Sequence, residues 1–267
     1  MMAPMSECRE KSPAMSANGT GPVKYRRILL KLSGEVLGNR ASGECIDPDI
    51  VTGIAHRVQA VAALGVQVSI VLGGGNIFRG IRGEARGITR TSGDYMGMLS
   101  TIINGLALQN ALEQVGLQTR LQTAIDMPKV AEPFVQRRAL RHLEKGRIVI
   151  FAGGTGNPYF TTDTAAALRA SEIGAEVLIK ATKVDGIYTA DPSKNPGARR
   201  YEVLGYQEAL QRRLRVMDSA AFALCMDNHI PIIVCDFFDA DALVRVIRGE
   251  KVGTLVTDVP DAPGKTA

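Results

Sequence analysis

The sequence has no tryptophan, and phenylalanine and tyrosine together make up 5% of its 267 residues. A hydrophobic core built with few large rings must be aliphatic, which is typical of parallel sheets covered by helices. Long hydrophobic runs are also missing, because the longest apolar segments are far too short to span a bilayer. The N-terminal residues lack both an apolar stretch and a basic run, so we expect no signal peptide.

Paired cysteines are absent from the chain. None of its four cysteines belongs to a Cys-x-x-Cys pair, and the three histidines show no metal-ligand spacing. Cys225 and Cys235 lie in apolar segments, where we expect them to be small core residues. The pattern predicts no zinc site, no disulfide framework and a reducing, cytoplasmic location.

Acidic residues are in the minority, and the net charge of the chain is +5. Basic residues cluster at 137–147 and at 212–215. Such a balance fits a partner that is either nucleic acid or a small molecule carrying phosphate. The basic residues are not interleaved with aromatic ones as in sheets that bind RNA, so nucleic acid is the weaker interpretation.

Apolar runs and helical patterns alternate along the chain. Strands are predicted at 26–32, 66–72, 117–124, 147–152, 176–180, 231–237 and 253–256. This alternation predicts an α/β fold, a three-layer sandwich with a mostly parallel central sheet and helices on both faces. We expect one domain over residues 24–257, a disordered tail at 1–23 and a flexible tail at 258–267.

The helices have signals of their own. Asp47 and Pro48 are typical of a helix start, and Gly65 is expected to end that helix. Further helices are predicted at 91–116 and 132–144, and the polar residues 35–46 predict a surface loop. The helix at 91–116 has an apolar stripe that we expect in the core, made of Met96, Leu99, Ile103, Leu106 and Leu112.

Three glycine-containing turns follow predicted strands. They are Lys31-Leu-Ser-Gly34, Gly73-Gly-Gly-Asn-Ile-Phe-Arg-Gly80 and the segment 153–163. Glycine lets the backbone approach a ligand closely, and a turn from strand to helix exposes N–H groups that favour an anion. Because the carboxyl ends of parallel strands meet at one edge of a sheet, we expect these turns to form one ligand site.

Charged residues in these turns point to phosphate. Lys31 and Arg79 supply cations, and Asp163 is predicted in the first turn of a helix that Thr161 or Thr162 caps. There Asp163 would orient the lysine or hold a metal ion. Each feature alone has a simpler explanation: a strand-end lysine that reaches water, a loose loop, or a capped helix. Together they indicate phosphoryl transfer or polyphosphate binding.

Five segments resemble the bacterial uridylate (UMP) kinases, a branch of the amino-acid kinase fold family. They are 31–35, 73–80, 93–98, 154–163 and 180–192, and the resemblance covers nearly all of the predicted domain. The Lys-x-Ser-Gly turn marks only the superfamily, whereas Gly154-Thr-Gly-Asn-Pro-Tyr-Phe-Thr-Thr-Asp163 is far more specific. The resemblance implies an enzyme that transfers phosphoryl from ATP to UMP with Mg²⁺, in pyrimidine nucleotide synthesis.

The same resemblance implies the residues of the site, without naming metal ligands. The catalytic set comprises Lys31, Arg79 and Asp163. The positions that match the ATP site are Lys31, Leu32, Ser33, Gly34, Gly75, Arg79, Thr182, Tyr188, Asp191 and Asp218. The positions that match the UMP site are Gly74, Asp94, Thr155, Gly156, Asn157, Pro158, Tyr159, Phe160, Thr161 and Thr162.

Regulation is a further implication of the resemblance. The family is typically a homohexamer that GTP activates and UTP inhibits. The chain departs from the expected pattern at Gln109 and Asn110, which are uncharged. The positions that match the effector regions are Arg40, Ala41, Ser42, Gly43, Glu44, Cys45, Arg120 and Arg147.

Two other functions fit parts of the sequence. A kinase of the same fold acting on a small carboxylate, such as an amino acid, explains the lysine and glycine turns but not the segment 154–163. A UMP-sensing regulator that binds DNA or a partner protein would use the basic clusters, and salt-dependent retention on DNA would support it.

The predicted cations give a direct test. Removing a preorganised donor that stabilises the transferring group costs about 10²–10³ in turnover. Lys31→Ala and Arg79→Ala are therefore expected to lose most of kcat while remaining folded, as measured by a coupled ADP-release assay and circular dichroism. Near-normal turnover in either purified variant would remove that residue from the catalytic set.

Overall fold

Nine strands form the central sheet of the computed structural model, which describes residues 22–39, 41–78, 87–192, 194–195, 197–212, 214 and 217–258. Their order across the sheet is β4-β3-β5-β2-β1-β6-β8-β9-β7. The strands are β1 (Arg27–Leu32), β2 (Gln67–Leu72), β3 (Thr119–Thr123), β4 (Glu132–Pro133), β5 (Ile148–Ala152), β6 (Val177–Thr182), β7 (Val203–Gly205), β8 (Ile232–Asp236) and β9 (Thr254–Thr257).

The strand pairs of this sheet are parallel except for β8 with β9. The predicted mostly parallel sheet is therefore confirmed. β1 is buried on both faces, and its alternate side chains enter different halves of the core. Leu29 packs in the cluster that contains helix α5 (Thr162–Ile173), whereas Leu30 packs in the cluster that contains helix α1 (Pro48–Ala62).

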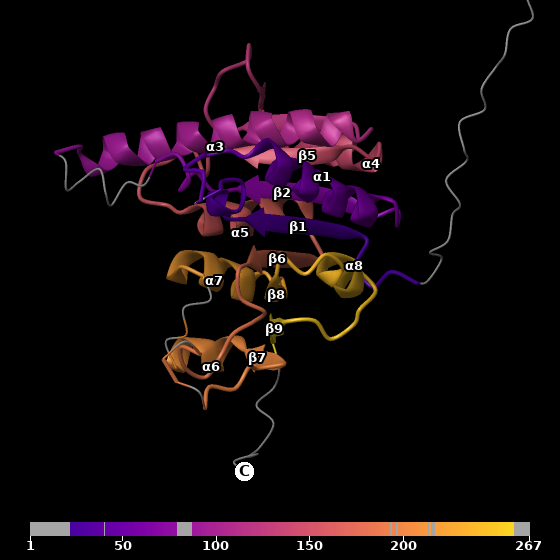
Figure 1. The fold of residues 1–267 in the computed structure, drawn as a ribbon, viewed down its shortest axis with the longest axis vertical. Coiled ribbons are helices and arrows are strands. Elements are labelled where there is room, and N and C mark those ends of the chain that lie inside the picture. The colour runs from indigo at the N-terminus through magenta and orange to yellow at the C-terminus, as the bar shows by residue number, and fades with distance from the viewer. Residues whose placement is uncertain are drawn as a thin grey trace, which may run out of the picture.

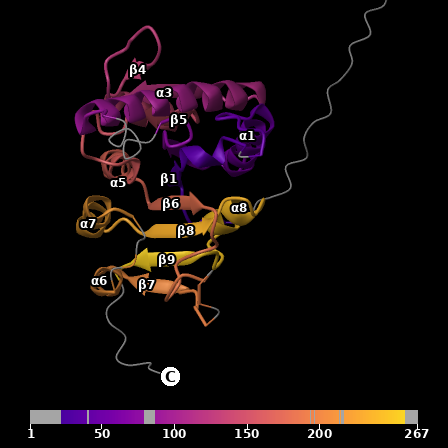
Figure 2. The ribbon, with the colours of Figure 1, turned by 60° about the vertical axis from the view of Figure 1, so that its left-hand side comes forward.

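Helices cover both faces of the sheet, as predicted (Figure 1). Figure 2 shows α5, α6 and α7 on one side of the sheet and α1 and α8 on the other. Buried residues of α3 join the cluster of α1 and α8, and those of α4 join the cluster of α5. The α-helices are α1 (Pro48–Ala62), α3 (Arg90–Gln114), α4 (Gln136–Glu144), α5 (Thr162–Ile173), α6 (Tyr206–Gln211), α7 (Ser219–Asp227) and α8 (Ala242–Ile247).

The start of α1 follows the sequence signal. The Asp47 carboxylate accepts hydrogen bonds from the backbone N–H groups of Asp49 and Ile50, at 2.9 and 3.2 Å, and Pro48 is the first helical residue. An Asp cap followed by proline satisfies N–H groups that would otherwise lack partners. Gly65 has a φ of 79°, a left-handed conformation that suits the end of a helix.

Two local expectations are wrong. The helix predicted at 132–144 begins only at Gln136, because Pro133 disfavours a helical backbone at Glu132, and these two residues form β4. The loop predicted at 35–46 is only partly at the surface. Gly34–Val36 form a short 3-10 helix, and Val36 is buried in the core.

The apolar stripe of α3 is the largest departure from expectation. Of its five members only Leu112 is buried, whereas the buried side of the helix carries small and polar residues beside Met98, Ile102 and Leu108. Periodicity detects an apolar face but not what covers it. The exposed large apolar residues of α3 are Tyr95 (45% exposed), Met96 (40%), Leu99 (46%), Ile103 (48%) and Leu106 (39%).

The two predicted tails lie largely outside the described residues. Near the N-terminal end of the described chain, Lys24 donates its backbone N–H to the carbonyl of Ile247 at 2.8 Å. At the other end, Asp258 lies 2.6 Å from Nδ1 of His229. Throughout the described ranges, every helix is too short or too polar to cross a membrane.

Candidate active site

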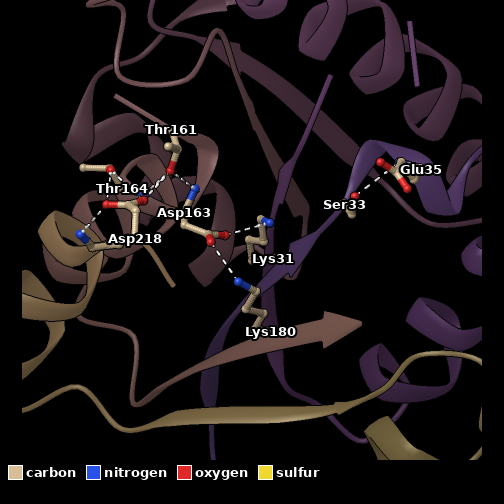
Figure 3. A network of polar contacts seen from close by, with 9 residues as sticks. Lys31, Ser33, Glu35, Thr161, Asp163, Thr164, Lys180 and Asp218 are labelled. Atoms are coloured by element: carbon tan, nitrogen blue, oxygen red, sulfur yellow. Dashed lines mark hydrogen bonds and ion pairs between the residues drawn. The ribbon is translucent and has the colours of Figure 1, made fainter. Parts of the chain in front are cut away.

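Two lysines project from adjacent strands at the carboxyl edge of the sheet. β1 and β6 are parallel neighbours, and their register pairs Lys31 directly with Lys180. Side chains at paired positions of parallel strands point to the same face. Both ammonium groups therefore lie on the side of the sheet that α5 covers, close to its first turn (Figure 3).

Asp163 lies between these lysines. Its Oδ1 is 2.7 Å from Nζ of Lys31, and its Oδ2 accepts a hydrogen bond of 2.8 Å from Nζ of Lys180. The Thr161 hydroxyl caps α5 by accepting from the N–H groups of Asp163 and Thr164. The helix start thus fixes the carboxylate, and the carboxylate fixes both lysines. We call Lys31, Asp163 and Lys180 the charged trio.

Burial and charge act against each other in the charged trio. Burial alone would raise the pKa of Asp163, but the positive charges of Lys31 and Lys180 outweigh it and lower that pKa. Burial is the main cause that lowers the pKa of Lys180, and the like charge of Lys31 adds to it. Asp163 therefore stays ionised at neutral pH.

Asp218 connects the start of α5 to the start of α7. As the N-cap of α7 it accepts a hydrogen bond from the N–H of Ala221 at 3.0 Å. It also accepts from the hydroxyls of Thr161 and Thr164, the latter at 3.0 Å. Two helix N-termini, each with partially positive N–H groups, are thereby held next to the charged trio (Figure 3).

The first two glycine turns lie against each other. The N–H of Gly73 donates to the carbonyl of Leu32 at 2.9 Å. Any side chain at Gly34 would collide with the carbonyl of Gly73 and with Oδ1 of Asn76, so this position requires glycine. Ser33, which precedes Gly34, accepts from the N–H of Glu35 at 3.4 Å. Gly75 lies in the second of these turns, whereas Arg79 lies outside the described residues.

The third turn depends on its glycines in a different way. Gly153, Gly154 and Gly156 have φ values of 75°, 58° and 81°, a left-handed region that other residues adopt at a cost. Thr155 accepts from the N–H of Asn157 at 3.2 Å and so closes the tip of the turn. The rest of the turn reaches α5 through Pro158, Tyr159, Phe160, Thr161 and Thr162.

Asp94 joins the third turn to α3. Its Oδ2 accepts the backbone N–H of Tyr159 at 2.7 Å, and Nε of Arg90 lies 2.9 Å from the same oxygen. Because α3 begins at Arg90, Asp94 lies in its second turn rather than the predicted first turn. Gly74 packs against α3 too, since a Cβ there would lie 2.6 Å from the carbonyl of Gly97. Gly74, Asp94 and Tyr159, three of the predicted UMP residues, therefore meet at this helix.

The predicted ATP residues beyond the turns follow β6. Thr182 ends this strand and donates its hydroxyl to the carbonyl of Val184 at 2.7 Å. Tyr188 donates to Asp185 at 2.6 Å, and Asp191 is 3.9 Å from Nζ of Lys194. Tyr188 and Asp191 thus occupy the outer part of the loop after β6, and their role with ATP stays a prediction.

The predicted effector residues separate into two groups. Ala41, Ser42, Gly43, Glu44 and Cys45 belong to the loop after β1, whereas Arg40 lies outside the described residues. The carbonyl of Cys45 accepts a hydrogen bond from the Asn76 side chain at 2.7 Å, which places this loop beside the second glycine turn. The loop therefore borders the carboxyl edge of the sheet.

Arg120 and Arg147 lie at the opposite edge, near the starts of β3 and β5. Nε of Arg120 is 3.4 Å from Glu132, and Arg147 is 3.0 Å from Nδ1 of His142, whose Nε2 is 3.0 Å from Glu132. Burial alone would raise the pKa of Glu132, but hydrogen bonds from Gln122 and His142 lower it. Beside this cluster is an open hollow lined by Glu132, Arg137, Arg138, Arg141 and His142.

Two members of the site were not predicted from the sequence. Lys180 closes the charged trio, and Thr164 donates to Asp218. Lys180 was visible as a polar residue at the end of an apolar run, as Lys31 was. What reveals its role is the register of β1 with β6, which only the assembled sheet provides.

The donor groups of the site bear on the Mg²⁺ ion that the sequence resemblance predicts. Within the described ranges, no group of three or more His, Cys, Asp or Glu side chains is arranged to hold a metal. The carboxylates of Asp163 and Asp218 are engaged by lysines and hydroxyls. Such a site fits Mg²⁺ held mainly by phosphate oxygens, which is common for this ion, rather than by a protein cage.

The charged trio predicts how the protein responds to acid. Since folding lowers the pKa of Asp163, its ionised form stabilises the fold above the unfolded pKa of about 3.9, and this contribution disappears as the pH falls through the folded value. Asp163→Asn is expected to lower the free energy of unfolding by about 3 kcal/mol at pH 7, because it leaves two neighbouring lysines without their carboxylate. The difference in the free energy of unfolding between wild type and this variant is expected to become smaller below pH 4.

Urea unfolding at several pH values between 3 and 7 measures the free energy of unfolding of wild type and of Asp163→Asn. Asp227→Asn, which removes an exposed carboxylate from α7, is the control and is expected to follow the wild-type curve. If the free energies of unfolding of wild type and Asp163→Asn differ by the same amount at pH 7 and at pH 3, the ionic role of Asp163 is contradicted.

The sequence and the fold are similar to those of known proteins. The model of the amino acid kinase family matches residues 26–236. The structure is similar to a UMP kinase from Bacillus anthracis, with 39% identity, a TM-score of 0.86, and coverage of 88% of this chain and 97% of that chain. It is also similar to a UMP kinase from Ureaplasma parvum, with 38% identity, a TM-score of 0.82, and coverage of 88% of this chain and 100% of that chain. A uridylate kinase from Archaeoglobus fulgidus is similar as well, with 29% identity, a TM-score of 0.66, and coverage of 86% of this chain and 99% of that chain. The chain belongs to the amino acid kinase family.

Proposed function

We propose that the protein is a UMP kinase, which transfers the γ-phosphoryl group of ATP to UMP and forms ADP and UDP. The observation that carries the proposal is the charged trio at the carboxyl edge of the sheet, between glycine turns that are free to approach phosphates. The similar proteins from Bacillus anthracis and Ureaplasma parvum are UMP kinases, which supports UMP as the acceptor.

The transfer moves one phosphoryl group in line between two oxygens. A phosphate oxygen of UMP forms a bond to the γ-phosphorus, and the bond from that phosphorus to the bridging oxygen of ADP breaks. Positioning and neutralisation of charge do most of the catalytic work in such a reaction. Lys31 and Lys180 supply positive charge to the moving group, and Asp163 keeps both ammonium groups in place. Arg79 remains a proposed further cation.

The substrates are assigned to different turns. We place the ATP phosphates against Lys31 to Gly34 and Gly75, with the nucleoside toward the loop that contains Thr182, Tyr188 and Asp191. We place UMP against Gly74, Asp94 and residues 155–162. Mg²⁺ bound to ATP would neutralise phosphate charge. Asp218 is proposed to act on the ATP side by holding the starts of α5 and α7 together.

A coupled assay of ADP release tests the activity and its rivals. We expect turnover with UMP, little with CMP, and none with aspartate or glutamate, which a small-carboxylate kinase would use. Asp163→Asn is expected to lose most turnover and to bind UMP as well as or better than wild type, because a carboxylate no longer repels the phosphate. An amino acid as the better acceptor would overturn the proposal.

Asp94 is proposed to select the sugar of UMP. A site built to hydrogen-bond a hydroxyl discriminates against an analogue that lacks it. We expect wild type to prefer UMP strongly over dUMP, and Asp94→Asn to raise KM for UMP and to shrink the UMP-to-dUMP ratio of kcat/KM. Asp94 also accepts the backbone N–H of Tyr159, so a change in the turn alone would raise KM for both nucleotides. The UMP-to-dUMP ratio of kcat/KM is therefore the informative quantity. An unchanged ratio in the folded variant would leave Asp94 with the structural role alone.

Self-association and effector binding complete the proposal. The exposed apolar residues of α3 form a continuous helical face of the kind that marks protein interfaces, and we propose that it contributes to a homohexamer. GTP is proposed as activator and UTP as inhibitor, with Arg120 and Arg147 as anion-binding candidates. Free cysteines among the described residues fit a reducing cytoplasm.

Light scattering tests the assembly. Wild type is expected at six times the 28.6 kDa of one chain, and Leu99→Glu is expected to yield smaller species, because a charge would be buried in the interface. Leu210→Glu is the matched control, since Leu210 is a comparably exposed leucine on α6. Equal masses for Leu99→Glu and wild type would exclude this face from the interface.

A further inference from the structure

The buried side of α3 carries polar residues among apolar ones such as Met98, Ile102 and Leu108, which is unusual for a helix packed on a hydrophobic core. Thr101 and Asn104 lie three positions apart in the helix and share this side. Thr101 and Asn104 are buried, at 2% and 0% exposure. Buried polar side chains are retained where their hydrogen bonds are satisfied, so the partners of these residues indicate their role.

Asn104 and Asn76 form a closed pair of side-chain amides. Nδ2 of Asn104 donates to Oδ1 of Asn76 at 2.7 Å, and Nδ2 of Asn76 donates to Oδ1 of Asn104 at 2.9 Å. The second hydrogen of each amide goes to backbone, from Asn104 to the carbonyl of Gly73 and from Asn76 to the carbonyl of Cys45, both at 2.7 Å. All four amide hydrogens are thereby used.

This amide pair supports the first two glycine turns. Oδ1 of Asn76 and the carbonyl of Gly73, both of which accept hydrogen bonds from Asn104, are the atoms that would collide with a side chain at Gly34. Gly34 therefore rests directly on the group that Asn104 holds in place. A shift of Asn104 would move both turns that are proposed to contact ATP.

Thr101 makes the corresponding contact with the third turn. Its Oγ1 accepts the backbone N–H of Gly153 at 2.8 Å and donates to the carbonyl of Met98 at 2.7 Å. Gly153 begins the turn that is proposed to hold UMP. One face of α3 is thus hydrogen-bonded to the turns on both sides of the proposed reaction, through residues only three positions apart.

We infer that Thr101 and Asn104 are positioning residues that fix the distance between the two phosphates of the reaction. The inference rests on the proposed function, because it assumes that the turns after β1 and β2 hold the donor, with only Gly74 of the second turn facing UMP, and that the turn after β5 holds the rest of the acceptor site. Neither side chain contacts the charged trio in the described structure, so both act through the turns. A misplacement of about 1 Å between reacting groups costs on the order of 10² in rate.

Thr101→Val tests the acceptor side, because valine keeps the shape and removes the hydroxyl. We expect kcat to fall at least about tenfold and KM for UMP to rise while KM for ATP changes little. Thr101→Ser, which restores the hydroxyl, is expected to recover most of kcat. Ser100→Ala is the matched control. Ser100 is also buried on α3, but among the described residues its hydroxyl bonds only the Met96 carbonyl of the same helix.

Asn104→Ala tests the donor side. It leaves the amide of Asn76 and the carbonyl of Gly73 without their partner, and we expect KM for ATP to rise more than KM for UMP, since Gly74 is the one proposed UMP contact in this turn. If this variant does not fold, Asn76→Ala breaks the same amide pair from a less buried position. A structural role alone would instead change both KM values by the same factor, in step with the melting temperature.

Amide hydrogen exchange separates failure of this inference from failure of the proposed function, since it needs no substrate. We expect faster exchange at 153–156 in Thr101→Val and at 73–76 in Asn104→Ala, with little change in Ser100→Ala. If wild type turns over UMP, but Thr101→Val and Asn104→Ala have the same kinetics and amide exchange as Ser100→Ala, the inference is overturned and the proposed function is not. Wild type inactive with UMP would overturn the function, and unchanged exchange would still overturn the positioning role.

Discussion

The contact of one carboxylate with two lysines is the interaction on which the site depends. Lys31 and Lys180 are paired across parallel strands, so their ammonium groups would repel each other without Asp163. Asp163 can lie between them only because α5 begins where the third glycine turn delivers it. The sheet register, the helix cap and the turn geometry therefore converge on one charged group.

The alternation of strands and helices was predictable because each element carries its own local pattern. Elements set by longer-range contacts were not. β4 and β7 have only two and three residues, too few for a period to be visible. The face of α3 was misjudged because four residues of the predicted stripe are exposed, while the buried side includes Thr101 and Asn104, whose hydrogen bonds hold the glycine turns.

The site was predictable where chemistry and spacing coincide in a short segment. Lys31, the glycine turns and the Thr161 cap could be inferred from their neighbours alone, and the structure brings them together. Lys180 and Asn104 required the assembled fold, because the partners that explain them come from other elements. A lysine at a strand end and an asparagine within a helix have many ordinary explanations until those partners are known.

The engagement of Asp163 also limits what that residue does chemically. Both of its oxygens contact ammonium groups and its pKa is lowered, so it is a poor proton acceptor at neutral pH. Transfer to a nucleotide phosphate needs no such acceptor, since the attacking oxygen of a phosphate monoester loses its last proton near pH 6. The rise of activity from acid toward neutral pH would then report the ionisation of the substrate rather than that of the protein.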